Sequence, residues 1–171
     1  IESLCSVQKH LINLFRKISM AQETIISFDV NNGLAEVILK RPAQYNSFSY
    51  NLRAELTKAL EQIEDDPNIR VTVIRGEGPG FCAGADLTET PGSSIPDQLE
   101  KEYKPIFQQI VDGKKLYIAA DHGSAAGIGA ALALACDFLV MSEQSRLSLI
   151  FSNIGLIPDG GANWSLCTKL G

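Results

Sequence analysis

The sequence has few of the residues that build metal sites, disulfide frameworks or nucleic-acid surfaces. Its 171 residues include four cysteines and two histidines. No two cysteines form a Cys-x-x-Cys pair, so we expect no zinc or other metal site. Widely spaced cysteines in a chain of this size also argue against a disulfide scaffold and favour a reducing, intracellular compartment. The net charge of −5 lacks the basic excess that nucleic-acid binding usually needs.

Long hydrophobic runs are absent as well, so we expect no membrane span. Hydrophobic residues make up 45% of the chain and charged residues 20%, which is typical of a globular domain with one core. The acidic balance does not exclude an anionic ligand, because a glycine turn at a helix N-terminus can bind phosphate on an acidic protein.

The two ends predict an incomplete chain. It begins at Ile1 rather than Met, and it stops at Gly171 just after an expected helix. We expect residues 1–19 to be a leader or linker, with disorder as one alternative, and residues 20–171 to form the folded core. The basic, amphipathic composition of 1–19 fits part of a mitochondrial presequence, a linker, or upstream sequence that is not normally translated.

Hydrophobic periodicity predicts strands that alternate with helices, which is typical of the α/β class. An Asn-Asn-Gly turn within 24–41 predicts a hairpin. We expect further strands at 69–78, 115–121 and 137–143, and helices at 49–66, 98–113, 130–135 and within 155–171. The glycine-rich segment 78–90 and the turn-rich segment 91–97 are expected to be loops.

The glycine turn Gly123-x-x-x-Gly127-Ile128-Gly129 admits two interpretations. Its spacing is that of short-chain dehydrogenases, which bind a nicotinamide dinucleotide there. Such an enzyme carries the turn near its N-terminus, with a ribose-binding acid about 20 residues further on and a Tyr-x-x-x-Lys pair later. Here the turn lies late in the chain, and no tyrosine follows it. The dehydrogenase interpretation therefore fails in the visible chain.

Other polar residues suggest chemistry by their type alone. Asp121, His122 and Ser124 are the residue types of a hydrolase triad, but they are nearly adjacent, and a triad needs convergence in space. Lys40 and Arg41 are candidates to approach the phosphates of a nucleotide-like ligand, with solvated surface charge as the alternative.

Four segments together resemble the crotonase superfamily of enoyl-CoA hydratases and isomerases. They are "KRPAQYNSFS", "GFCAGADL" (80–87), "HGSAAGIGAALALACD" and "IGLIPDGG", and they occur in the family's order from about Met20 to Gly171. Within the superfamily, "FSNIGLIPD" is similar to the Δ3,Δ2-enoyl-CoA isomerases and to the ring isomerase of phenylacetate catabolism. The resemblance implies a crotonase (ClpP/crotonase-like) core of repeated ββα units that lacks its C-terminal helical region.

The resemblance also assigns roles to both glycine loops. The backbone N–H groups of Ala85 and Ile128 are the matching positions for an oxyanion hole that holds the thioester carbonyl. Preorganised donors at that oxygen lower the barrier to enolate formation. Asp86 is expected to fix its loop by hydrogen bonding. The residues predicted to contact substrate are Ala83, Gly84, Asp86, Leu87, Gly127 and Phe151.

Asp159 is the predicted proton shuttle, because it matches the functional carboxylate of several isomerases of the family. The alternative is an N-cap of the following helix. The two glutamates of family hydratases fall at Ala131 and Phe151, which cannot titrate. A single carboxylate suits an isomerase, since the base that takes a proton from C2 can return it at C4.

The sequence therefore predicts an isomerase that shifts an enoyl-CoA double bond from Δ3 to Δ2 in fatty acid metabolism. A hydratase and a non-catalytic CoA-binding homologue are the alternatives. No cofactor is expected, because CoA is part of the substrate. The resemblance further implies a homotrimer or hexamer for the complete protein and favours mitochondria or peroxisomes.

Overall fold

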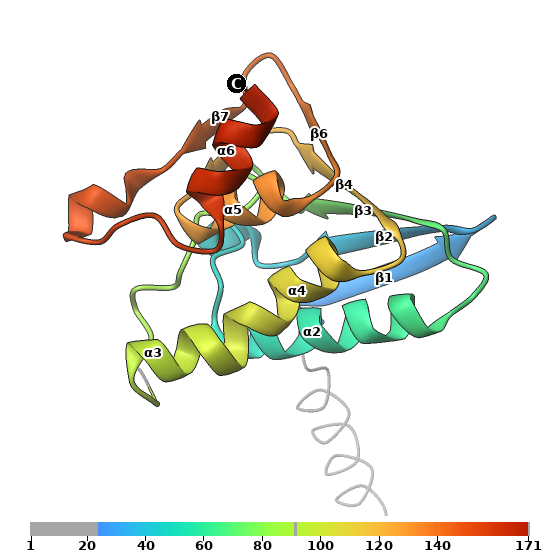
Figure 1. The fold of residues 1–171 in the computed structure, drawn as a ribbon, viewed down its shortest axis with the longest axis horizontal. Helices are drawn as coiled ribbons and strands as arrows, with labels where there is room; N and C mark the ends of the chain where they lie inside the picture. The colour runs from blue at the N-terminus through green and yellow to red at the C-terminus, as the bar shows by residue number, and fades with distance from the viewer. Residues whose placement is uncertain (1–23, 91, 171) are drawn as a thin grey trace, which may run out of the picture.

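The computed structural model describes residues 24–90 and 92–170. The predicted leader, residues 1–19, lies outside them. A five-stranded sheet in the order β1-β2-β3-β4-β6 forms the centre of the fold, and a two-stranded sheet of β5 and β7 lies beside it. Helices α2 and α4 run along one side of the large sheet. Helices α5 and α6 lie above α4 in the view of Figure 1. This arrangement belongs to the α/β class that the sequence predicts.

The predicted hairpin is confirmed as β1 (Ile26–Asn31) and β2 (Leu34–Leu39), which pair antiparallel. Asn32 and Gly33 both adopt positive φ, at 51° and 82°. Two such residues match the right-handed twist of the paired strands, which explains why Asn-Gly stands there. Every second residue of β2 is buried in the hydrophobic core.

The remaining strands of the large sheet are parallel and need crossover connections. Helix α2 (Tyr50–Asp65) joins β2 to β3 (Val71–Gly76). Ser49 caps α2 by accepting a hydrogen bond from the Leu52 amide, and the predicted apolar face is buried. Strands β4 (Leu116–Asp121) and β6 (Phe138–Met141) complete the sheet.

The segment between β3 and β4 differs from the sequence prediction. Residues 91–97 were expected to be a loop, but α3 (Ile95–Gln98) begins within them. Ser94 accepts a hydrogen bond from the Asp97 amide, and Pro96 lies in the first turn, where its missing N–H has no cost. The helix continues through η2 (Leu99–Tyr103), a π-helical turn, into α4 (Lys104–Asp112).

Short elements near the carboxyl ends of the strands were missed by the sequence analysis. They are η1 (Pro42–Gln44), β5 (Ser124–Ala126), β7 (Arg146–Ser148) and η3 (Ile150–Ile154). Strands of three residues carry too little periodicity to be recognised. Helix α5 (Ile128–Ala135) and helix α6 (Ala162–Leu170) form where they were expected.

The two glycine loops are held side by side by backbone hydrogen bonds. The Ser124 carbonyl accepts from the amides of Phe81 and Cys82, and the Cys82 carbonyl accepts from the Ala126 amide at 2.9 Å. An isolated parallel β-bridge also joins Phe48 to Ala85. These contacts bring residues about forty positions apart in sequence to one end of the large sheet.

Substituting Gly129 with alanine is expected to lower the free energy of unfolding by about 1–3 kcal/mol, the usual cost of overpacking. A Cβ at this position would lie 2.3 Å from the Cys82 carbonyl oxygen and 2.8 Å from its Sγ. Gly92→Ala is the matched control, since a Cβ there meets nothing within 4 Å. Urea unfolding measures both, and an equal stability of the two variants would contradict this packing.

Among the described helices, none is both long and apolar enough to cross a membrane. Within the same residues, no group of three or more His, Cys, Asp and Glu side chains is placed to hold a metal ion.

Candidate functional site

A cavity of about 400 Å³ lies where the two glycine loops meet α3, η2 and η3. We name it the glycine-loop cavity. The structure brings every predicted site residue to its wall: Ala83, Gly84, Ala85, Asp86, Leu87, Gly127, Ile128, Phe151 and Asp159. Its lining is mostly apolar and includes a few polar groups that could orient a ligand.

Two unpaired backbone N–H groups border this cavity. The backbone groups on either side of the Ala85 N–H are hydrogen-bonded. The Gly84 carbonyl accepts from the Phe48 amide, and the Asp86 amide donates to the Phe48 carbonyl. Among the described residues, the Ala85 amide has no acceptor. Ile128 is the first residue of α5, so its amide has no partner within the helix. Both groups are therefore free to donate to a ligand oxygen.

The two loops approach closely because glycine occupies the contact points. Gly84 adopts φ +96°, and a Cβ on it would lie 2.7 Å from the Ala126 carbonyl oxygen and 3.6 Å from the Ile128 nitrogen. Gly127, at φ +52°, turns the chain into α5. A larger residue at position 84 would separate the two N–H groups.

Asp159 lies in the loop that connects η3 to the start of α6. Its Oδ1 atom is buried and has no hydrogen-bond partner among the described residues. Burial raises the pKa of the Asp159 carboxyl above its ordinary value of 3.8. The Ala162 amide donates to the backbone carbonyl of Asp159, at 3.0 Å. No side-chain cap from Asp159 to α6 is present in the described part, which removes the main support for the N-cap alternative.

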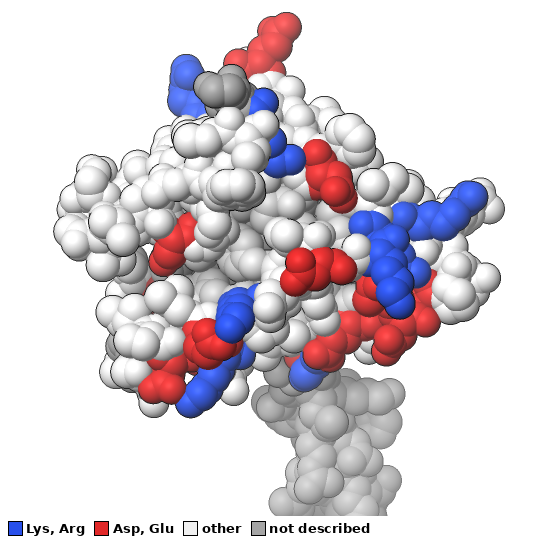
Figure 2. All heavy atoms as spheres, viewed as in Figure 1, with Lys and Arg blue, Asp and Glu red and all other residues white. Residues whose placement is uncertain are grey.

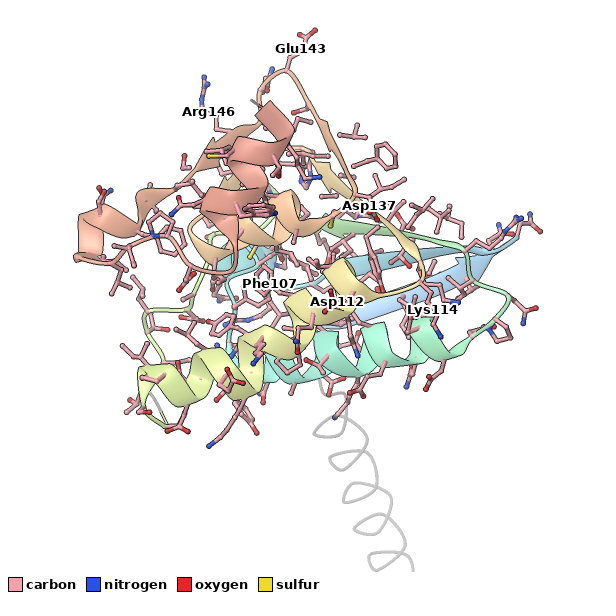
Figure 3. The ribbon with its side chains drawn as sticks, viewed as in Figure 1. Phe107, Asp112, Lys114, Asp137, Glu143 and Arg146 are labelled. Atoms are coloured by element: carbon pink, nitrogen blue, oxygen red, sulfur yellow. The ribbon has the colours of Figure 1, made fainter. Side chains whose placement is uncertain are left out.

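The backbone around Asp159 is fixed by the next residue. Gly160 adopts φ +59°, and a Cβ there would lie about 3 Å from Ala131, Ile128 and Phe107. Figure 3 shows Phe107 on α4, facing the region beneath α5. The loop that carries Asp159 therefore packs against the same helix that supplies the Ile128 amide.

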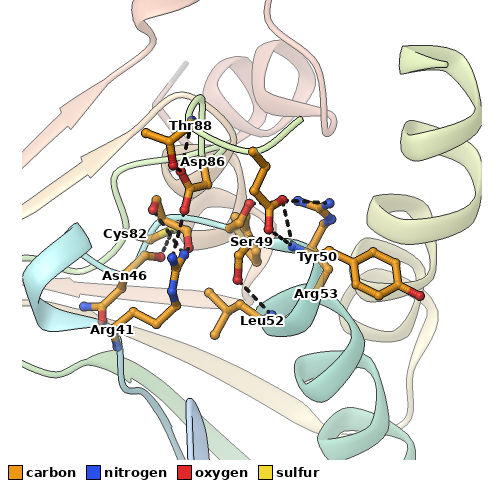
Figure 4. Close-up of polar contacts among 12 residues, drawn as sticks. Arg41, Asn46, Ser49, Tyr50, Leu52, Arg53, Cys82, Asp86 and Thr88 are labelled. Carbon is orange, nitrogen blue, oxygen red and sulfur yellow. Dashed lines mark hydrogen bonds and ion pairs between the residues drawn. The ribbon is translucent and has the colours of Figure 1, made fainter. Parts of the chain in front are cut away.

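Asp86 holds the first glycine loop in place, as expected from the sequence. Its Oδ1 accepts from the Thr88 hydroxyl at 2.6 Å, and its Oδ2 pairs with Arg41 Nη2 at 2.8 Å (Figure 4). Arg41 also donates to Ser47. This corrects the surface-charge alternative for Arg41, because its guanidinium is largely buried and is paired with Asp86 and Ser47.

The Thr88 hydroxyl first, and then Arg41, lower the pKa of Asp86 from 3.8 to about 2. A depressed pKa contributes stability that is present above the unfolded pKa and is lost as the pH falls through the folded pKa. Asp86→Asn should therefore cost the most free energy of unfolding above about pH 4, and the cost should shrink toward pH 2. Urea titrations across this range measure it, and a cost independent of pH would contradict the ion pair.

The sequence analysis missed a second charged cluster on the cavity wall. Arg53 is almost completely buried and pairs with Glu102 at 2.7 Å and with Glu89 at 3.5 Å. The Glu89 carboxylate also accepts from the Tyr50 amide, with both oxygens within 2.9 Å of the nitrogen. The available signal was the position of Arg53 on the buried face of α2, where a charge requires partners.

The triad residue types do not form a triad. The Asp121 carboxylate accepts from the Gly123 amide at 3.0 Å, and His122 Nε2 lies 2.6 Å from the Gly78 carbonyl oxygen. Both residues line a separate, shallow cavity at the carboxyl ends of β3, β4 and β6. Ser124 makes backbone contacts to the first glycine loop.

Comparison with known proteins agrees with this fold. The enoyl-CoA hydratase/isomerase family model matches residues 29–171. The chain therefore belongs to the enoyl-CoA hydratase/isomerase family, the crotonase superfamily.

Individual relatives have different activities. The chain is 38% identical over 143 residues to 1,2-epoxyphenylacetyl-CoA isomerase of Escherichia coli K12, covering 80% of this chain and 55% of that protein. It is 35% identical over 144 residues to mitochondrial methylglutaconyl-CoA hydratase of Homo sapiens, covering 82% and 42%. The chain thus spans about half the length of the curated relatives it matches.

Solved structures show the same similarity. An enoyl-CoA hydratase from Polaromonas sp. JS666 superposes with a TM-score of 0.74 at 34% identity, covering 85% of this chain and 59% of that one. An enoyl-CoA hydratase from Mycobacterium avium subsp. paratuberculosis K-10 gives a TM-score of 0.76 at 30% identity, covering 86% and 56%.

Proposed function

We propose that the protein is an isomerase that moves the double bond of a 3-enoyl-CoA to the Δ2 position. The observation that carries the proposal is the state of the three carboxylates on the cavity wall. Asp86 is held by Arg41 and Thr88, and Glu89 by Arg53 and the Tyr50 amide. Only Asp159, among the described residues of this wall, has a buried oxygen without a partner.

The proposed mechanism begins with the thioester carbonyl between the Ala85 and Ile128 amides. Asp159 removes a proton from C2, and the electron pair moves toward the thioester oxygen to give an enolate. The two N–H groups stabilise the charge on that oxygen. The enolate then collapses, the double bond forms between C2 and C3, and Asp159 returns the same proton to C4.

Burial of Asp159 suits this role. A carboxylate whose conjugate acid has a raised pKa is a stronger base than a solvated carboxylate, which favours removal of the C2 proton. Phe151, almost fully buried in η3, supplies apolar surface on the same wall. An apolar environment keeps water from the enolate and thereby favours isomerisation over hydration.

The test is an assay of 3-hexenoyl-CoA that follows absorbance of the conjugated product. A parallel assay with crotonyl-CoA measures hydration, and calorimetry measures binding of CoA thioesters. Isomerisation that clearly exceeds hydration supports the proposal. Hydration alone would favour the hydratase alternative, which the named relatives include. Binding without turnover on either substrate would indicate a non-catalytic CoA-binding protein.

A homotrimer, or a hexamer made of two trimers, is the proposed assembly. Figure 2 shows charged side chains interspersed over the lower part of the molecule, while the lobe that carries η3 is largely uncharged. Several large apolar side chains are exposed around that lobe: Ile150, Ile154, Leu156, Ile157 and Trp164. Exposed apolar side chains of this kind support association, and light scattering tests it.

A further inference from the structure

Tyr103 occupies an unusual position on the wall of the glycine-loop cavity. It is the last residue of the π-helical turn η2, in which the Lys104 amide donates to the carbonyl of Leu99. Pro105 follows, and a proline inside a helix lacks an N–H and pushes away the carbonyl four residues earlier. The wider turn accommodates that proline. Single π-helical turns within α-helices are frequent at functional sites.

The hydroxyl of Tyr103 is held at a fixed position by Arg53. The Nη1 group of Arg53 donates to Tyr103 Oη at 3.2 Å, and the guanidinium lies 4.9 Å from the centre of the ring. Phe48 packs against the same ring edge to face. Arg53 is itself fixed by the Phe48 carbonyl, at 2.7 Å, and by Glu102. The position of the hydroxyl is therefore determined before any ligand binds.

The proton of this hydroxyl has no acceptor. The oxygen accepts from Arg53, and no described residue accepts a hydrogen bond from Tyr103 Oη. Burial raises the pKa of Tyr103 to about 12, so the group remains a donor at neutral pH. An unsatisfied donor in an apolar cavity costs free energy, which a ligand oxygen would recover.

Tyr103 and Asp159 line the same cavity, together with the apolar residues Ile95, Leu99 and Phe151. The thioester carbonyl is assigned to the Ala85 and Ile128 amides, and Asp159 to the carbons beside it. The free donor of Tyr103 therefore remains for a more distant part of the acyl group.

We propose that Tyr103 donates a hydrogen bond to an oxygen on the acyl group, and that the preferred substrates are acyl-CoA thioesters with a carbonyl, ether or hydroxyl oxygen remote from the thioester. This inference rests on the proposed function and narrows its substrate class. A site with a buried donor discriminates against an analogue that lacks the acceptor, because the donor then stays unpaired.

The experiment measures binding of thioesters that cannot isomerise, so that its result does not depend on turnover. Calorimetry compares 4-oxohexanoyl-CoA with 4-methylhexanoyl-CoA, and 5-oxohexanoyl-CoA with 5-methylhexanoyl-CoA. The proteins are the wild type, Tyr103→Phe and Tyr117→Phe. Tyr117 is the matched control, because its hydroxyl is buried and unpartnered in β4, and it does not line the cavity.

The wild type is expected to bind the oxo member of at least one pair about tenfold more tightly. Tyr103→Phe should abolish that preference and bind the methyl member as the wild type does, while Tyr117→Phe keeps the preference. Unchanged melting temperature and methyl-ligand affinity verify that Tyr103→Phe is folded.

Equal binding of both members by the wild type, or a preference that survives in Tyr103→Phe, would overturn the inference. If the wild type prefers the oxo thioester, Tyr103→Phe loses that preference, and the wild type still shows no isomerase turnover, the proposed function alone is overturned. Failure of every thioester to bind would overturn both.

Discussion

Replacing Asp159 with asparagine is expected to lower turnover of 3-hexenoyl-CoA by about 10²–10⁴-fold, the usual contribution of a general acid–base group. The carboxamide keeps the shape of the side chain but cannot take a proton from C2. Because the proposed mechanism places the thioester carbonyl elsewhere, at the Ala85 and Ile128 amides, the dissociation constant of a saturated acyl-CoA should change little. Initial rates and calorimetry on the same preparations measure the two quantities.

The control for this prediction is Glu143→Gln, which also removes one carboxylate. Glu143 is exposed at the end of the molecule opposite α4, as Figure 3 shows. Its substitution should leave turnover unchanged. If Asp159→Asn retains wild-type turnover while remaining folded, the proton shuttle is a different group and the proposed mechanism fails.

Replacing Ala85 with proline is expected to lower turnover by about 10²–10³-fold, the cost of losing one oxyanion donor. Proline removes the N–H that the proposed mechanism directs at the thioester oxygen. No described residue accepts a hydrogen bond from this amide, so its loss breaks no internal contact of the native protein. The effect should fall mainly on kcat, since the charge on the oxygen is largest in the enolate-like transition state.

Ala85→Ser is the matched variant, because it changes the same exposed side chain and keeps the N–H. It should remain within a few-fold of wild-type turnover. Circular dichroism and the melting temperature show whether Ala85→Pro is folded. Equal losses in the proline and serine variants would mean that the side chain, and not the amide, matters at this position.

Much of the fold could be predicted from local patterns. The Asn-Gly turn and the alternation of β2 predict the hairpin, and the apolar stripe of 49–66 predicts α2. Helix α3 was missed because its start depends on a Ser94 cap and a proline within a segment rich in turn formers. The strands β5 and β7 were missed because their formation depends on pairing with each other, which sequence periodicity does not record.

Some residues of the candidate site could likewise be predicted from the sequence, and others could not. Gly84 and Gly127 could be singled out from the sequence, because their conformations require glycine whatever surrounds them. Tyr103 could not, since it would be an ordinary helix residue without its partner, and the only signal for Arg53 was its position on the apolar face of α2. Their hydroxyl–guanidinium contact joins positions 50 residues apart.

The sequence by itself determined the family pattern, the two glycine turns and the presence of an aspartate before the last helix. Only the tertiary structure decided which carboxylate is free to act. Asp86, Glu89 and Asp159 are equivalent as residue types, but Arg41 reaches Asp86 across 45 positions and Arg53 reaches Glu89 across 36. Ion pairs of this range form only when the chain is folded, and they leave Asp159 as the carboxylate with a buried, unpartnered oxygen on the described cavity wall.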